Sequence, residues 1–297
     1  MAEKADILCI GSVLWDIIGR SAGSMRLGSD VPGRITRLPG GVVLNIAMTL
    51  KRFDLTPALL SVVGQDAEGQ ELVDRCEAMG LITEHLYRSH DLPTDRYMAV
   101  EAQNGLIAAI ADAHSLEHAG RKILLPLTNG VFGNADEPFE GVIALDGNLT
   151  EELIQEIVDD RAFSKADLRV APASPGKAER LKPLFDHSGA TLYVNLEEAG
   201  YLCDAEFTSS DEAAAALLDR GASRVLVTNG GEQTCDGHAD GLITSNPPDV
   251  SVTRITGAGD TFMAAHIAAE IGGHSRQDAL VHALQAAAIY VSGDIGA

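Results

Sequence analysis

Short apolar runs alternate with amphipathic stretches through most of the chain. The predicted strands cover Ile7–Gly11, Ala58–Val63, Gly141–Leu145, Leu168–Ala171, Thr191–Val194 and Arg224–Thr228. Several of these runs are apolar at consecutive positions, which is typical of strands buried on both faces of a parallel sheet. The predicted helices cover Ala67–Met79, Thr150–Asp160, Lys177–Phe185 and Asp211–Arg220. Alternating strands and helices predict a three-layer α/β domain with a mainly parallel central sheet.

Two regions depart from this alternation. Val31–Leu38 has the pattern of a short amphipathic strand, and Asp95–Asp112 holds two β-like runs on either side of Asn104-Gly105. Asn-Gly between such runs indicates a hairpin, because both residues accept a positive φ. We expect segments 13–39 and 92–113 to pair as a small β-lid over the binding edge of the sheet. An ordinary surface hairpin is the alternative. Without a repeat or linker, residues 1–297 are predicted to form a single domain.

Composition narrows the function. A formal charge of −21 disfavours nucleic acid and anionic membrane surfaces as partners, since both are bound through Lys and Arg. The four cysteines, Cys9, Cys76, Cys203 and Cys235, form no C-x-x-C pair, so buried free thiols in a reducing compartment are expected. The N-terminus shows no signal-peptide pattern, and no apolar run is long enough to span a bilayer. These features favour a cytoplasmic location.

The strongest local signal is Thr256-Gly257-Ala258-Gly259-Asp260, followed by the apolar stretch Met263–Ile271. This pattern predicts a glycine-rich turn that leads into a buried helix. The free N–H groups and positive dipole end of such a helix bind anions, and small residues allow close approach. Asp260 in the first turn could accept a hydroxyl proton, which together with the anion site suits phosphoryl transfer. Alternatively, the glycines only shape a turn and Asp260 caps the helix.

Other named motifs are missing. The Gly257-x-Gly259 pair has Phe262 where a dinucleotide-binding fingerprint requires Gly or Ala, which argues against a nicotinamide-dependent oxidoreductase. The chain contains no G-x-x-x-x-G-K-[ST] phosphate-binding loop and no G-x-S-x-G nucleophile elbow.

Four further elements precede this glycine turn. They are Gly11 with Asp16, the run Gly40-Gly41-Val42-Val43-Leu44-Asn45-Ile46-Ala47, Asn195-Leu196-Glu197-Glu198, and Val227-Thr228-Asn229-Gly230-Gly231. With Thr256–Asp260, this ordered set resembles the PfkB (ribokinase-like) family of carbohydrate and nucleoside kinases over nearly the whole chain. The resemblance implies a ribokinase-like fold and an ATP-dependent kinase that transfers the γ-phosphate to a primary hydroxyl.

The resemblance also implies catalytic roles. Asp260 would deprotonate the acceptor hydroxyl, and an anion hole for the transferred phosphoryl group would be formed by Gly257, Ala258 and Gly259. Substrate hydroxyls or ring groups would be bound by Asp16, Gly41 and Asn45. The alternatives are that Asn45 caps the helix that begins at Ile46 and that Asp16 is a turn residue.

The remaining implied roles concern ATP and Mg²⁺. Asn195, Thr228 and Gly230 would bind the nucleotide, while Glu198 would organise Mg²⁺, through water because this ion sheds its hydration shell reluctantly. The alternative for Glu198 is a solvated helix acid. A nucleoside- or sugar-binding protein without catalytic activity is the other reading of the fold, although binding alone does not require Asp260.

Within the family, the chain resembles pseudouridine kinases most. The likeness rests on Asp30–Ile35, Leu38–Val42 and Ile107–Asp112, which belong to the expected lid and substrate floor. It implies the 5′-hydroxyl of pseudouridine as acceptor, with ribose, fructose or a related sugar as the alternative. A homodimer through the lid is a further expectation of the resemblance.

One departure from the family pattern concerns a monovalent cation. Arg254 and Ile255 stand where many members carry Asp and Thr, and the Asp helps to bind an activating cation. We hypothesise that the Arg254 guanidinium replaces that cation and makes activity insensitive to K⁺. The alternative is that Arg254 points to solvent.

Four histidines are weaker candidates. His114 and His118 have a spacing that could bind metal on a helix, but a solvated loop after the hairpin is the preferred interpretation. His266 and His282 lie in apolar helices and are expected in the core or the nucleotide pocket rather than in catalysis.

Overall fold

Strand β1 (Ile7–Ile10) is buried on both faces, as its continuous apolar run predicts. In the computed structural model, which describes residues 5–293, Leu8 and Ile10 belong to one hydrophobic cluster, and Ile7 and Cys9 belong to another. The two clusters lie on opposite faces of the central sheet, because successive side chains of a strand point to opposite faces. Both faces must therefore be covered by helices.

The central sheet has eight strands in the order β14-β13-β12-β11-β10-β9-β1-β4. Their bounds are β1 (Ile7–Ile10), β4 (Pro57–Leu60), β9 (Val142–Asp146), β10 (Asp167–Ala171), β11 (Ala190–Asn195), β12 (Arg224–Asn229), β13 (Glu232–His238) and β14 (Gly241–Ser245). The pairs from β4 to β12 are parallel, and β13 and β14 join antiparallel at one edge. The predicted, mainly parallel α/β fold is confirmed.

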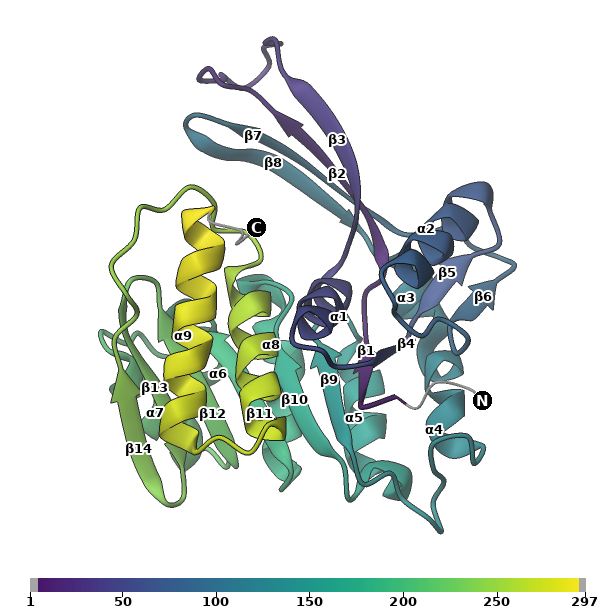
Figure 1. Cartoon of the computed structure of the whole chain (residues 1–297), viewed down its shortest axis with the longest axis vertical. Coiled ribbons are helices and arrows are strands. Elements are labelled where there is room, and N and C mark those ends of the chain that lie inside the picture. Colours follow the sequence, from purple (N-terminus) through teal and green to yellow (C-terminus); the bar gives the residue numbers. More distant parts are fainter. Residues whose placement is uncertain (1–4, 294–297) are drawn as a thin grey trace.

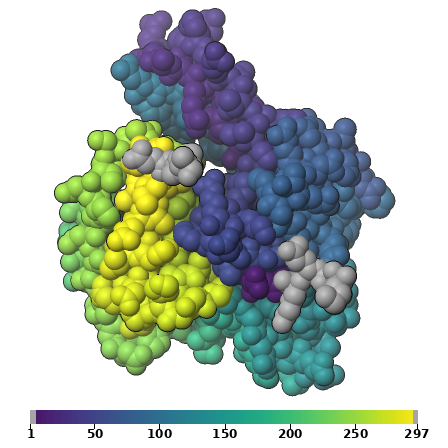
Figure 2. Space-filling model, viewed as in Figure 1, coloured from purple at the N-terminus to yellow at the C-terminus, as the bar shows by residue number. Residues whose placement is uncertain are grey.

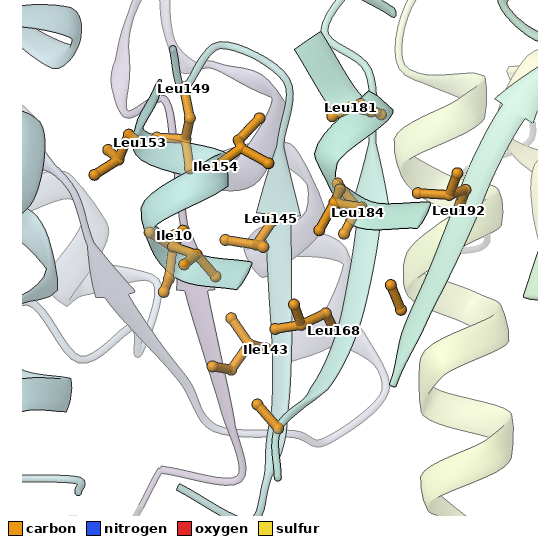
Figure 3. Close-up of a cluster of buried hydrophobic side chains, with 14 of the residues drawn as sticks. Ile10, Ile143, Leu145, Leu149, Leu153, Ile154, Leu168, Leu181, Leu184 and Leu192 are labelled. Carbon is orange, nitrogen blue, oxygen red and sulfur yellow. The ribbon is translucent and has the colours of Figure 1, made fainter. Parts of the chain in front are cut away.

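Helices cover each face (Figure 1). One face carries α1 (Val42–Arg52), α2 (Ala67–Ala78), α8 (Ala258–Ile271) and α9 (Arg276–Ser292). The other carries α3 (His114–Ala119), η1 (Gly120–Leu124), α4 (Leu125–Thr128), α5 (Glu151–Asp159), η2 (Arg161–Phe163), η3 (Pro175–Asp186), α6 (Leu196–Cys203) and α7 (Ser210–Asp219). Figure 3 shows part of the second core, where α5 and η3 pack leucines against β9 and β10. All four cysteines are buried free thiols, as expected.

A second sheet, the side sheet, contains β3 (Arg34–Gly40), β2 (Leu14–Arg20), β7 (Arg96–Ala102) and β8 (Gly105–Asp112) in that order. Its far end projects away from the helices (Figures 1 and 2), while its near end is tied to α2 by the ion pairs of Glu68 and Glu71 with Arg96 and Arg37. The Asn104-Gly105 turn forms the expected hairpin, with Gly105 at φ 96°. The sheet leaves Ile35 79 % and Ile110 62 % exposed, but dimerisation through the side sheet stays a prediction.

Several predicted elements need correction. The expected strand Ala58–Val63 is divided at Ser61: β4 ends before it, and β5 (Val62–Gly64) pairs instead with β6 (Tyr87–Ser89). The Ser61 hydroxyl donates to the Gly11 carbonyl oxygen and holds this break in place.

The other two corrections concern helices. The expected helix at Lys177–Phe185 is the 3₁₀ helix η3, because Pro183 lies inside it and cannot donate a backbone hydrogen bond. His114 and His118 lie on α3 rather than in a loop, and residues 5–293 contain no cluster suited to a metal ion. No helix in this range has both the length and the apolar character needed to cross a membrane.

Candidate active site

A cleft of about 1050 Å³ opens at the carboxyl ends of the parallel strands, between the central sheet and the side sheet. In parallel α/β sheets this edge is where ligands bind. Every site residue predicted from the sequence lines the cleft: Asp16, Gly41, Asn45, Asn195, Glu198, Thr228, Gly230, Gly257, Ala258, Gly259 and Asp260. The structure thus brings together residues that are separated by more than 200 positions in the chain.

Helix α8 begins at Ala258, directly after the glycine turn. Gly257 has φ 88°, and a Cβ atom there would lie 2.5 Å from the Tyr290 hydroxyl oxygen, so only glycine fits. That hydroxyl donates to the Thr256 carbonyl oxygen at 2.8 Å, which ties the turn to α9. The first N–H groups of α8 have no intrahelical acceptor and point toward the cleft end of the helix, where an anion could bind.

Asp260 lies in the first turn of α8, and its Oδ2 accepts a hydrogen bond from Asn45 Nδ2 at 2.9 Å. Asn45 lies inside α1, whose first residue is Val42, so the alternative that Asn45 caps this helix is wrong. Packing between α1 and α8 therefore places an amide against the carboxylate proposed as the base.

The environment of Asp260 is acidic. Burial raises the pKa of Asp260 to about 7, the Asn45 hydrogen bond opposes this, and the nearby charges of Asp146, Asp16 and Glu198 add to it. A pKa near neutrality suits a general base that accepts a proton and is later deprotonated.

The raised pKa of Asp260 also affects stability. The folded state keeps a proton that the unfolded chain releases near pH 3.8, so Asp260 lowers the free energy of unfolding as the pH rises toward 7.

Asp16 projects from β2 beside the glycine pair. A Cβ at Gly40 would lie 2.1 Å from Asp16 Oδ2, and a Cβ at Gly41, whose φ is 102°, would lie 2.4 Å from the Ser12 carbonyl oxygen. The pair thus makes room for the Asp16 carboxylate at the start of α1. The alternative that Asp16 is a turn residue is wrong, since it lies within a strand. Burial raises the pKa of Asp16 to about 6.

Asn195 and Glu198 form a capping box at the start of α6. Asn195 Oδ1 accepts from the Glu198 N–H at 2.9 Å, and Glu198 Oε2 accepts from the Asn195 N–H at 2.8 Å. Glu198 is only 8 % exposed, so the alternative of a solvated helix acid is wrong. Burial raises the pKa of Glu198 to about 7. Its Oε1 remains for a water ligand of Mg²⁺, an ion that keeps much of its hydration shell and so does not require a cluster of direct protein ligands.

Thr228 and Gly230 border the cleft at the end of β12. Thr228 is the register partner of Asn195 on β11, so the two side chains lie on neighbouring strands at the same edge. Gly230 has φ 57°, and the space where a side chain would project is open. This opening next to Asn195 is compatible with the phosphates of a nucleotide.

Four polar residues at the site were missed from the sequence. The cleft is also lined by Ser12, Asn148 and Lys177. Asp146 lies beneath them and binds the backbone N–H groups of Ser12 and Asn148. Asp146 Oδ2 accepts from the Ser12 N–H at 2.7 Å and from the Val43 N–H at 3.0 Å. A carboxylate directly after the predicted strand Gly141–Leu145 was the available signal for Asp146, because functional side chains gather where parallel strands end.

The side chain of Arg254 packs against α9. Its side chain is half-buried, its Nε donates to the Tyr290 carbonyl oxygen at 2.7 Å, and its guanidinium carbon lies 3.8 Å from the centre of the Tyr290 ring. The alternative of a solvent-directed side chain is therefore wrong. The cation is instead held at the carboxyl end of α9.

His266 is fully buried, and its Nδ1 lies 2.8 Å from the Tyr193 hydroxyl. Burial lowers the pKa of His266 to about 4, so it is neutral at physiological pH. His282 is half-buried, with its ring centre 5.5 Å from that of Phe53, and does not line the cleft. His266 thus lies in the core, as predicted, whereas the predicted core or nucleotide-pocket position is wrong for His282.

Comparison with known proteins decides the family. The family model described as pfkB family carbohydrate kinase matches residues 4–294. The chain belongs to this family. Like other pfkB kinases, it is a phosphotransferase that acts on an alcohol group of a sugar or nucleoside and uses ATP.

Relatives of this pfkB kinase differ in their named substrates. Pseudouridine kinase of Escherichia coli is 28 % identical over 89 % of this chain and 83 % of its own length. Ribokinase of Bacillus subtilis is 27 % identical over 96 % and 92 %. The structure of Arabidopsis thaliana ribokinase complexed with ribose and ATP matches with a TM-score of 0.75 at 18 % identity, over 97 % and 93 %, which shows the shared fold.

The Asn45–Asp260 hydrogen bond predicts the pH dependence of this kinase. Activity should rise with pH through about 7, as Asp260 ionises. In Asn45→Ala the carboxylate loses a stabilising donor, so the pKa of Asp260 rises and the acidic limb of kcat/KM should move to higher pH by about half a pH unit or more.

Thr49→Ala is the matched control, since Thr49 lies one turn later in α1 and donates to the Asn45 carbonyl oxygen rather than to Asp260. Glu198 titrates in the same range, but its partner is Asn195, so a shift seen with Asn45→Ala reports on Asp260. A limb that stays in place or moves to lower pH in Asn45→Ala would contradict the assignment of Asp260.

Proposed function

We propose that this pfkB kinase transfers the γ-phosphoryl group of ATP to a primary hydroxyl, with the 5′-hydroxyl of pseudouridine as the acceptor. The observation that carries the proposal is the placement of Asp260, a half-buried carboxylate with a raised pKa, at the start of α8 and beside Asn45. Phosphoryl transfer to a hydroxyl requires a base for the hydroxyl proton and hydrogen-bond donors for the charge of the transferred phosphoryl group. The cleft provides both at the start of α8.

The chemistry follows from these positions. Asn45 holds Oδ2 of Asp260, so Oδ1 is the oxygen that takes the proton of the acceptor hydroxyl. As that O–H bond breaks, the hydroxyl oxygen bonds to the γ-phosphorus, and the bond between this phosphorus and the β,γ-bridging oxygen breaks to release ADP. The anion hole was expected from Gly257, Ala258 and Gly259, but the Ala258 N–H donates to the Ile255 carbonyl oxygen at 3.0 Å. The N–H groups of Gly259 and Asp260 would therefore stabilise the charge on the transferred group.

Mg²⁺ held near Glu198 and Asn195, through its water ligands, would neutralise phosphate charge during the transfer. The ionised form of Glu198 is the one that attracts a cation. Since burial raises the pKa of Glu198 to about 7, binding of the ion should strengthen as the pH rises through neutrality. Thr228 and Gly230 border the same part of the cleft and would lie against the nucleotide phosphates.

The side sheet supports a nucleoside as acceptor. Asp16, Tyr97 and Ala111 are register partners on adjacent strands, so they share the face that lines the cleft, and Ala109 follows two residues away on the same face. The alanines leave room above Asp16, and Tyr97 offers an aromatic ring. A carboxylate for ribose hydroxyls next to space for a flat base suits a nucleoside better than a free sugar. Similarity to a pseudouridine kinase supports the particular nucleoside.

A panel of acceptors tests the proposal. Pseudouridine, uridine, ribose and fructose are each supplied with Mg-ATP while ADP release is followed, and ³¹P NMR identifies the phosphorylated position. We expect the highest kcat/KM for pseudouridine, with phosphate on the 5′-oxygen. Turnover of ribose or fructose without turnover of any nucleoside would contradict the proposed substrate and leave a sugar kinase, which the similarity to a ribokinase supports.

Arg254 leads to a second proposal about this enzyme. Its guanidinium binds a carbonyl oxygen at the end of α9, close to the turn that precedes Asp260, and so supplies a fixed positive charge there. We expect turnover to be the same in Na⁺ and K⁺ buffers. Arg254→Gln should lower kcat, and this loss should be partly reversed by K⁺. A steep activation of the wild-type enzyme by K⁺ would show that Arg254 does not replace the cation.

A further inference from the structure

The cleft is rich in negative charge and holds a single positive side chain. Its lining includes the carboxylates of Asp16, Glu198, Asp249 and Asp260, and among residues 5–293 the only Lys or Arg that lines it is Lys177. The structure gives Lys177 no carboxylate partner within this range, unlike its neighbour Arg180, which pairs with Glu117. A half-buried ammonium that contacts no carboxylate directly is suited to bind a ligand oxygen.

The position of Lys177 is built by neighbouring side chains. Its Nζ donates to Asn148 Oδ1 at 2.6 Å, and Asn148 Nδ2 in turn donates to Ser12 Oγ at 3.0 Å. Asn148 is only 8 % exposed, and its N–H is bound to Asp146 Oδ1 at 2.8 Å. This chain of hydrogen bonds fixes the ammonium over the ends of β1 and β9. An ammonium has three donors, and Asn148 takes one of them.

Lys177 lies on the acceptor side of the cleft. β1 and β9, which carry its anchors, are neighbours in the sheet, whereas the proposed nucleotide residues follow β11 and β12 on the far side of β10. The strand order thus places the anchors of Lys177 on the opposite side of β10 from the proposed nucleotide residues, where the distal part of the acceptor would lie.

We propose that Lys177 is a specificity-determining residue that donates a hydrogen bond to a carbonyl oxygen on the base of the acceptor nucleoside. The inference rests on the proposed function and narrows its substrate class to nucleosides whose base carries a carbonyl group. A half-buried ammonium prefers an electron-rich oxygen, and such a site discriminates against ligands that leave the donor unpaired. A free sugar, bound through Asp16 and Asn45, would not extend to Lys177.

The test compares Lys177→Met with Lys182→Met. Lys182 lies in the same 3₁₀ helix η3, is outside the cleft and pairs with Glu179, so its substitution makes the same change of charge. For each enzyme, kcat/KM is measured with pseudouridine, uridine and ribose, together with KM for ATP. Nucleoside binding is followed by calorimetry without ATP.

We expect Lys177→Met to lower kcat/KM for pseudouridine by about 10- to 100-fold and to weaken nucleoside binding by a similar factor. KM for ATP and any residual turnover of ribose should stay within about twofold of the wild-type values, and Lys182→Met should match the wild type throughout. Lys177→Arg, which keeps the charge and the donors, should recover part of the loss. If Lys177→Met does not fold, Lys177→Gln gives the same comparison.

Four results would overturn the inference. An equal loss for nucleosides and ribose would indicate a structural role through Asn148, and a raised KM for ATP would indicate a phosphate contact. Unchanged nucleoside kinetics in Lys177→Met would remove the role of Lys177 while leaving the proposed nucleoside kinase intact. A wild-type enzyme that neither binds nor phosphorylates any nucleoside would refute both the proposed function and the role of Lys177.

Discussion

The buried carboxylate of Asp146 is the interaction on which the site depends. It accepts hydrogen bonds from the N–H and hydroxyl of Ser12, from the N–H of Val43 and from the N–H of Asn148. One fully buried side chain at the end of β9 therefore joins the turn after β1 to the first residues of α1. Removing the hydrogen-bond partners of a buried charge lowers the free energy of unfolding by about 3–5 kcal/mol, so these hydrogen bonds strongly stabilise the junction. The direction of α1, and with it the contact between Asn45 and Asp260, follows from it.

The carboxylates of the cleft have pKa values near neutrality. Burial raises the pKa of Asp16 to about 6 and those of Glu198 and Asp260 to about 7, and at Asp260 the charges of Asp16 and Glu198 add to the effect of burial. An enzyme with a net charge of −21 can still bind a triphosphate, because helix N–H groups and a metal ion act locally. Two positive side chains lie away from these carboxylates. Arg254 is bound at the end of α9, and Lys177 is bound to Asn148 at the proposed acceptor side of the cleft.

Much of this arrangement could be predicted from the sequence, and the reasons for the failures are physical. Apolar runs and glycine turns identified β1 and the start of α8, because burial and positive φ leave local patterns. The antiparallel strands β13 and β14 were missed because they mix polar and apolar residues. The hydrogen bond between Asn45 and Asp260 spans 215 positions, so family resemblance could name both residues but not their contact. Lys177 was only the first residue of a predicted helix, because no local pattern in the sequence indicates that its side chain lines the cleft.

The central claim is that Asp260 removes the proton from the acceptor hydroxyl. Single-turnover kinetics of Asp260→Asn tests it most directly, with the acceptor that the wild type phosphorylates fastest and with ATP affinity measured by calorimetry. If Asp260 is the base, phosphoryl transfer in Asp260→Asn should slow by a factor of about 10²–10⁴ or more, while the Kd for ATP should stay within a few-fold of the wild-type value. Transfer at a rate within about threefold of wild type would contradict this claim.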